Sequence, residues 1–156
     1  MFDRIYKFIT RDNLEYNQSL TLNKIKQAIK CGNIDELKLL LMNESNIINI
    51  NARFPQLQNK TILMLACELD HIDCVQVILD SEGDINREGI YYGDSTLTSA
   101  CLSGNIELLH YLIDKGLLLN DTLIFECFFS LVKVKRIDKV ELIKVLLSHV
   151  QNINCT

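Results

Sequence analysis

The stretch IELLHYLI at residues 106–113 recurs in pattern 34 residues away on either side, as IDCVQVIL at 72–79 and VELIKVLL at 140–147. A fainter copy, IDELKLLL at 34–41, begins 38 residues before the first of these. A period of this length indicates stacked supersecondary units, because no single unit can bury its apolar face alone. The repeat therefore predicts a solenoid.

Each of the three clear copies is followed, seven residues after it ends, by an asparagine: Asn86, Asn120 and Asn154. The fainter copy closes on Asn51. Asparagine side chains readily form hydrogen bonds with nearby backbone groups in turns. We therefore interpret Asn86 as a residue whose side chain holds the turn between two units.

The third unit shows how one period is expected to fold. Ser95 is placed to cap a helix, since its hydroxyl can accept from a backbone N–H two or three residues on. Gly104 tolerates positive φ and ends that helix. A second helix is predicted over 106–114, where Lys115-Gly116 stops it. The apolar positions spaced for the inner side of these two helices are Leu97, Ala100, Cys101, Leu108, Leu109, Leu112 and Ile113.

The other units repeat this plan less cleanly. In the second unit Thr61 is the expected cap, and Asp70 takes the place of the glycine. In the first unit Asn23 is the expected cap. The last unit has only the second helix, and residues 121–136 predict a longer amphipathic helix without the turn and cap. An apolar pattern over residues 2–9 predicts a further amphipathic element that could cover the open end of the first unit.

These units resemble the ankyrin-repeat family, whose unit reads approximately G-x-T-P-L-H-x-A-A-x-x-G-H, then a V-V-x-L-L-L helix and G-A-x-x-N. Residues 61–67 with Asp70-His71, and 95–101 with Gly104-Asn105, meet the first phrase. The resemblance runs from about Asn23 to Asn154. It implies an all-α fold, an ankyrin-repeat solenoid of stacked helix-turn-helix units with short β-hairpin-like finger loops. The proline and histidine of the family phrase are absent, so we expect modest stability.

The length of 156 residues predicts one domain, and 48% apolar with 23% charged residues is typical of a globular chain. We expect a single ankyrin-repeat domain over 1–156. Its expected parts are an N-terminal cap at 1–21, repeat 1 at 22–51, repeat 2 at 52–86, repeat 3 at 87–120, and a degenerate repeat 4 or C-terminal cap at 121–156.

The charge and the cysteines bear on partners and location. Sixteen basic and twenty acidic residues give a net charge of −4, which offers no general attraction to nucleic acid or anionic membranes. No stretch approaches the ~18 apolar residues of a membrane helix, and no signal-peptide pattern is present. The six cysteines include no CxxC pair and are expected to be reduced thiols. We expect a cytoplasmic or nuclear protein that binds neither nucleic acid nor membrane and is monomeric when alone.

Candidate chemistry is sparse. Cys67, His71 and Cys74 have a spacing that would align soft metal ligands on one continuous helix, but the predicted turn at Asp70-His71 breaks that helix. Cys67 and Cys101 occupy a small-residue position, where cysteine behaves as a small buried hydrophobe. No histidine is predicted beside a polarised thiol, and no glycine-rich phosphate loop is present. We expect no catalytic residue, no metal and no cofactor.

The resemblance implies where a partner protein would bind. In the family, finger tips and the exposed edge of the first helix of each repeat form a concave strip. Ile90, Tyr91 and Tyr92 favour the second finger, since exposed tyrosines are common interface anchors. The alternative is that one of these tyrosines packs on the neighbouring finger. The candidate partner-binding residues are Lys30, Phe54, Leu57, Lys60, Glu68, Leu69, Ile90, Tyr91, Tyr92, Asp94, Leu102 and Ser103.

The resemblance favours a non-catalytic protein–protein interaction module, acting as an adaptor, inhibitor or targeting module. The alternative is a substrate- or partner-recruiting ankyrin segment of a larger enzyme or ubiquitin-pathway protein. A pocket in which polar groups converge would instead indicate an enzyme. One modification hypothesis follows as well, because the sequence leading to Asn86 is similar to that around asparagines hydroxylated in ankyrin repeats of other proteins.

Overall fold

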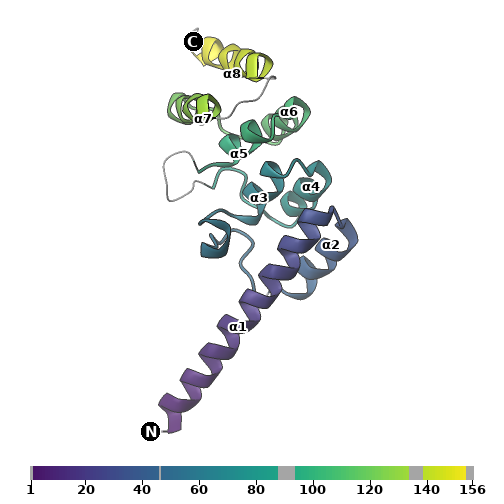
Figure 1. Cartoon of the computed structure of the whole chain (residues 1–156), viewed down its shortest axis with the longest axis vertical. Coiled ribbons are helices and arrows are strands. Elements are labelled where there is room, and N and C mark those ends of the chain that lie inside the picture. The colour runs from purple at the N-terminus through teal and green to yellow at the C-terminus, as the bar shows by residue number, and fades with distance from the viewer. Residues whose placement is uncertain (1, 46, 88–93, 134–138, 154–156) are drawn as a thin grey trace.

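Pairs of helices stacked along one axis make up the protein (Figure 1). The computed structural model describes residues 2–45, 47–87, 94–133 and 139–153. The helices are α1 (Phe2–Cys31), α2 (Ile34–Asn43), the 3-10 helix η1 (Pro55–Leu57), α3 (Ile62–Glu68), α4 (Ile72–Asp80), α5 (Thr96–Ser103), α6 (Ile106–Asp114), α7 (Asp121–Lys133) and α8 (Lys139–Ile153). The all-α solenoid expected from the repeat is confirmed.

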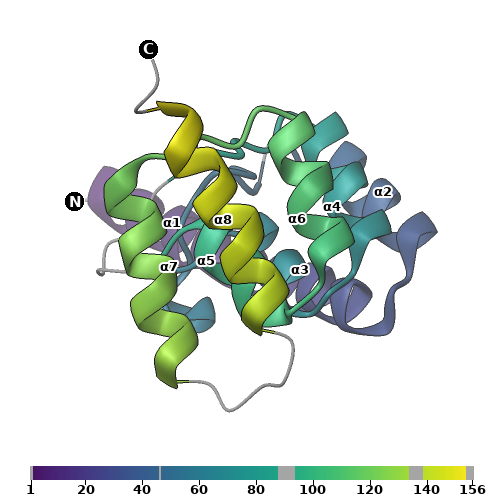
Figure 2. The same cartoon turned by 90° about the horizontal axis from the view of Figure 1, so that it is seen from above.

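The helices form an inner and an outer row. The first helices of successive units pack on one another in chain order, α1 on α3, α3 on α5 and α5 on α7, and α2 packs on α4. Seen from above, α2, α4 and α6 lie together on one side of the stack, and α7 lies on the other (Figure 2). The turn around η1 projects from the side of the stack opposite α2 and α4 (Figure 1).

Apolar residues at the 34-residue period build a continuous core. Leu63, Leu97 and Leu131 are all buried at the same position of α3, α5 and α7. Cys67 and Cys101 are buried at the small-residue position, as expected. Full burial of a leucine side chain contributes about 1.5–3 kcal/mol, so stacking between units, more than the propensity of these short helices, holds the fold.

The predicted caps and turns of the middle units are confirmed. Ser95 Oγ and Thr61 Oγ1 each accept from the backbone N–H three residues on, at 3.1 and 3.2 Å. α5 ends at Gly104 with φ of 83°, and Asp70 adopts the same left-handed conformation at φ of 62°. The Asp70 carboxylate also accepts from Nδ2 of Asn105 at 2.7 Å. This contact ties the turn of the second unit to that of the third.

The periodic asparagines join neighbouring units. The side chain of Asn51 donates to and accepts from the backbone of residues 82–84, at 3.0 and 2.6 Å. Asn86 makes the matching pair one unit later, since its Nδ2 donates to the Gly116 carbonyl at 3.1 Å and its Oδ1 accepts from the Leu118 N–H at 2.8 Å. The expected role of Asn86 in holding the turn between units is confirmed.

Two predicted helix boundaries are wrong. Asn23 caps no helix, because it lies inside α1, which is continuous from Phe2 to Cys31. No glycine or proline occurs before Gly32, so nothing ends the helix earlier. In contrast, α7 has the cap that was not expected, because Asn120 Oδ1 accepts from the Leu123 N–H at 2.8 Å.

The N-terminal half of α1 extends beyond the rest of the fold (Figure 1). At 1.5 Å per residue this 30-residue helix is about 45 Å long. Because it continues straight from the first unit, it does not fold back over that unit. The expectation that residues 2–9 cover the open end of the first unit is therefore wrong.

Candidate functional site

A shallow groove of about 240 Å³ lies between the first finger and the inner helix α3. Four candidate residues line it: Leu57 and Lys60 from the finger, and Glu68 and Leu69 from the end of α3. The structure thus brings together candidates that the sequence placed on two different elements. The groove combines an apolar floor with a charged rim.

An ion pair joins the finger to the helix. Lys60 Nζ lies 2.6 Å from Glu68 Oε2, and the two side chains are 14% and 38% exposed. An ion pair this close to solvent contributes at most about 1 kcal/mol. Its main effect is to fix the finger against α3. Because the Glu68 side chain is the more exposed of the two, it is the member of the pair that a ligand can contact.

The finger is a tight turn closed by a single antiparallel bridge between Phe54 and Lys60. Phe54 N–H donates to the Lys60 carbonyl at 3.2 Å, and Gln58 and Asn59 both have positive φ. Within this turn Leu57 is buried in the core. Leu57 is therefore not the exposed finger-tip residue that was expected, because the 3-10 turn that starts at Pro55 points its side chain inward.

The helix edges agree only in part with the expected strip. Lys30 is exposed at the end of α1, and Leu102 is half-buried at the end of α5. Ser103 is buried, and its hydroxyl donates to the Ala100 carbonyl at 2.7 Å while accepting from the Asn105 N–H at 3.2 Å. The expectation that Ser103 faces a partner is corrected, because these bonds hold it in the turn between α5 and α6.

The second finger was the favoured contact, but Ile90, Tyr91 and Tyr92 fall outside the described residues. Asp94, at the end of that finger, is half-buried. The role of the second finger therefore stays a prediction.

Two residues of the groove were missed by sequence reasoning. Lys26 and Leu65 both line it. Lys26 lies four residues before the candidate Lys30 in α1, and Leu65 lies four residues before the candidate Leu69. Residues four apart share a helix face. That spacing is the signal that could have found them.

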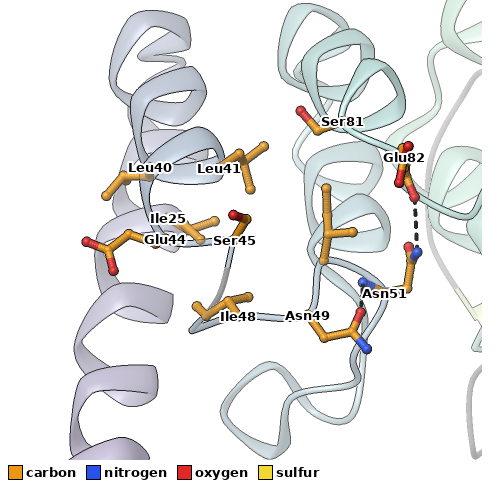
Figure 3. A pocket seen from close by; sticks show the side chains of 11 residues that line it. Ile25, Leu40, Leu41, Glu44, Ser45, Ile48, Asn49, Asn51, Ser81 and Glu82 are labelled. Carbon is orange, nitrogen blue, oxygen red and sulfur yellow. Dashed lines mark hydrogen bonds between the residues drawn. The ribbon is translucent and has the colours of Figure 1, made fainter.

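A larger cavity of about 390 Å³ lies between the ends of α2 and α4 and the loop that joins α2 to the first finger. Leu40, Leu41 and Ile48 give it an apolar side (Figure 3). The Asn51 amide at its rim is already engaged with the Glu82 carbonyl, as the dashed line in Figure 3 shows. Two further polar groups of the lining are engaged within their own segments, since Ser81 Oγ donates to the Val77 carbonyl at 2.8 Å and Asn49 Oδ1 accepts from the Asn51 N–H at 2.9 Å. We therefore assign this cavity no chemistry.

The buried thiols lack the features of a reactive site. α3 ends at Glu68 and α4 begins at Ile72, so Cys67 and Cys74 lie on different helices. Burial raises the pKa of both thiols, with the Asp73 charge adding to the effect at Cys74. In the part of the chain that the structure describes, no group of three or more His, Cys, Asp or Glu side chains is placed to hold a metal ion.

Comparison with known proteins identifies the fold. Residues 25–122 match the ankyrin-repeat family in three copies. The chain belongs to the ankyrin-repeat family. Ankyrin repeats are a general protein–protein interaction module and are generally non-catalytic. None of the described helices has both the length and the apolar character needed to span a membrane.

Several curated ankyrin-repeat proteins are similar to this chain. Human ankyrin repeat and SOCS box protein 11 is 32% identical over 92 residues, which are 59% of this chain and 26% of that protein. Mouse ankyrin repeat and SAM domain-containing protein 6 is 28% identical over 118 residues, covering 68% and 13%. Ankyrin repeat protein R837 of Acanthamoeba polyphaga mimivirus is 32% identical over 117 residues, covering 72% and 17%. The matched segment spans about a quarter or less of each relative.

Proposed function

We propose that this ankyrin-repeat chain is a non-catalytic module that binds a partner protein through its concave face, as an adaptor, inhibitor or targeting module. The observation that carries the proposal is the groove between the first finger and α3. It presents Leu65 and Leu69 beside the Lys60–Glu68 ion pair. An apolar floor with a polar rim is the usual anatomy of a protein interface.

Leu69 is the expected anchor of this contact. It is an exposed large hydrophobic at the end of α3, where the groove opens. Anchors that fill a pocket at an interface cost about 2 kcal/mol or more when truncated. We also expect the second finger to contribute to this contact, so Tyr91→Ala with Tyr92→Ala should remove on the order of 2 kcal/mol of partner affinity while folding stays nearly intact.

Affinity capture from native cell extract, read by mass spectrometry, tests the proposal. The test variant is Leu69→Glu, and the matched control is Leu39→Glu, an exposed leucine on α2 in the outer row. We expect a partner that the wild type and Leu39→Glu retain and that Leu69→Glu loses, with all three equally folded by circular dichroism. Equal capture by Leu69→Glu and the wild type would show that the binding face lies elsewhere.

A second role has one supporting observation. A relative that is 32% identical carries a SOCS box in addition to ankyrin repeats, and the matched segment is 26% of that relative. We propose as the alternative that this chain is the recruiting segment of a larger enzyme or ubiquitin-pathway protein. Under that alternative, co-expression of the natural full-length protein lowers the abundance of the captured partner, and blocking the proteasome restores it. Unchanged partner abundance would contradict it.

We propose a cytoplasmic or nuclear location. The described cysteines, Cys31, Cys67, Cys74, Cys101 and Cys127, are free thiols, and free thiols are typical of reducing compartments. Fluorescence microscopy of the tagged full-length protein checks this location, and signal confined to a secretory compartment would contradict it.

A further inference from the structure

The groove between the first finger and α3 has an excess of positive charge. Among its lining residues Lys26 and Lys60 are the cations and Glu68 is the anion. Lys60 Nζ already lies 2.6 Å from Glu68 Oε2, so these two charges offset each other. The charge of Lys26 remains, and it belongs to a chain whose net charge is −4. The groove therefore has the opposite sign of charge to the chain as a whole.

Lys26 lacks a carboxylate of its own. Within the described parts of the chain, no ion pair or side-chain hydrogen bond includes Lys26. The residue is half-buried where α1 borders the groove. Partial removal of an ammonium group from water costs free energy unless an acceptor or an anion takes the place of that water. An anion supplied by a ligand in the groove would offset this cost.

The other lysines at this end of α1 differ from Lys26. Lys24 is exposed, and because it lies two residues before Lys26 it projects from another side of the helix. Lys30 is also exposed and lies in the last turn of α1, where the negative end of the helix dipole favours a cation. Water and the helix dipole thus account for these two charges. Neither accounts for Lys26, which is half-buried and more than one turn from the end of the helix.

The size and apolar lining of the groove limit what an anionic ligand can be. Leu65 and Leu69 line the groove together with Lys26. Its volume of about 240 Å³ is below the roughly 300–1,000 Å³ of typical small-molecule sites. Leucine side chains also offer nothing that would bind a nucleic-acid phosphate. The groove instead suits one large apolar side chain of a peptide, with a carboxylate close to it in the same peptide.

We propose that the groove binds an acidic segment of a partner protein, in which an Asp or Glu carboxylate pairs with Lys26 and a neighbouring large apolar side chain packs on Leu65 and Leu69. The inference rests on the proposed function, because it names the partner chemistry for the same groove. An ion pair near solvent adds little affinity, but complementary charge speeds association and disfavours wrong partners. The apolar contact therefore supplies most of the affinity, and Lys26 selects acidic segments.

Selection of a phage-displayed library of random peptides on the wild-type protein tests the proposal, followed by fluorescence anisotropy of the enriched peptides. The test variant is Lys26→Met, because methionine keeps an unbranched apolar stem and removes the charge. Lys26→Arg keeps the charge. The matched control is Lys24→Met, which removes the same charge from another side of α1. Leu69→Glu reports separately on whether a peptide occupies the groove, and circular dichroism checks that all variants are folded.

We expect the enriched peptides to carry Asp or Glu close to a large apolar residue. Lys26→Met should raise their dissociation constants about fivefold, the upper range for an ion pair near solvent. Lys26→Arg and Lys24→Met should bind them as the wild type does, and Leu69→Glu should lose them. Added salt should weaken binding to the wild type more than binding to Lys26→Met, because salt screens the charged contact and not the apolar one.

Three results would overturn the proposal. Peptides that Leu69→Glu loses but Lys26→Met binds as tightly as the wild type would leave the groove as the binding site and remove its preference for acidic segments. Enrichment of basic or uncharged peptides, or of no peptide, would likewise contradict that preference. Peptides that Leu69→Glu still binds would occupy another surface, and this result alone would also contradict the proposed function of the groove.

Discussion

Replacing Asn86 with alanine removes both hydrogen bonds that the side chain makes to the next unit. One runs from Nδ2 to the Gly116 carbonyl at 3.1 Å and the other from the Leu118 N–H to Oδ1 at 2.8 Å. A typical hydrogen bond contributes about 0.5–1.5 kcal/mol net. Because Asn86 is exposed, water can replace part of each bond, and we expect a loss of about 1–2 kcal/mol. The thermal midpoint should fall by about 3–6 °C for a chain of this size.

Urea and thermal unfolding followed by circular dichroism measure this loss. Asn86→Asp is the informative companion, since it keeps an acceptor for the Leu118 N–H but sets a carboxylate oxygen against the Gly116 carbonyl. It should be no more stable than Asn86→Ala at neutral pH. Asn51→Ala should cost a similar amount. Asp84 couples the two sites, because its N–H donates to Asn51 Oδ1 at 2.6 Å and its Oδ1 accepts from the Asn86 N–H at 3.0 Å, so the loss in the double variant should differ from the sum of the single losses. A change within about 0.3 kcal/mol for Asn86→Ala would refute the reasoning, since that is the scale of neutral surface substitutions.

The remaining predictions concern the interior and the modification hypothesis. Gly83→Ala should destabilise the fold by about 1–3 kcal/mol in urea unfolding, because a Cβ there would lie 2.7 Å from a backbone carbonyl oxygen of α4; an unchanged midpoint contradicts it. Thr96→Val should raise stability by about 1 kcal/mol, because the buried Thr96 hydroxyl has no hydrogen-bond partner among the described residues; a loss of stability would show that the hydroxyl is satisfied. Burial raises the pKa of the Cys67 thiol, and a hydrogen bond that the Cys101 thiol donates to Cys127, together with burial, raises the pKa of Cys101. The folded state therefore keeps both protons above the ordinary thiol pKa of 9.0, where the unfolded state loses them, so stability falls as pH rises past that value. The double variant Cys67→Ala with Cys101→Ala should show a smaller decrease in the urea midpoint between pH 7 and pH 10 than the wild type. An equal decrease would show that other groups cause the pH dependence. Treatment with an asparaginyl hydroxylase should add one oxygen atom to the intact mass of the wild type but not of Asn86→Ala, and an unchanged wild-type mass rules the modification out.

Most of the fold could be predicted from sequence signals that act on the backbone within a few residues. Ser95 caps the helix that follows it and Gly104 ends that helix because the side chain or its absence acts on the adjacent backbone. Asn23 is not a cap, because the residues before it are already helical in α1. A capping residue begins a helix only where the chain before it leaves the helical conformation. A local signal thus predicted a helix end only where no neighbouring segment extended the helix.

The candidate site was harder to predict because it depends on which way a side chain points. Leu57 lies in the predicted finger, but the 3-10 turn buries it. Ser103 lies on the predicted helix edge, but two hydrogen bonds hold it inside. The approach of Lys60 to Glu68 depends on how the finger folds over α3, which no spacing within either segment specifies. Sequence patterns placed the elements of the site, and tertiary packing decided which side chains face the groove.

The stacking of units has a mechanical consequence. Every extensive helix contact among the described residues lies within a pair or between neighbouring pairs, so a load applied to the two ends crosses each junction in turn. The chain then yields at its weakest junction while the others stay intact. A ligand that contacts two adjacent units would hold them together and raise the force needed to separate them. The resistance of the molecule to pulling would thus report which junction is occupied.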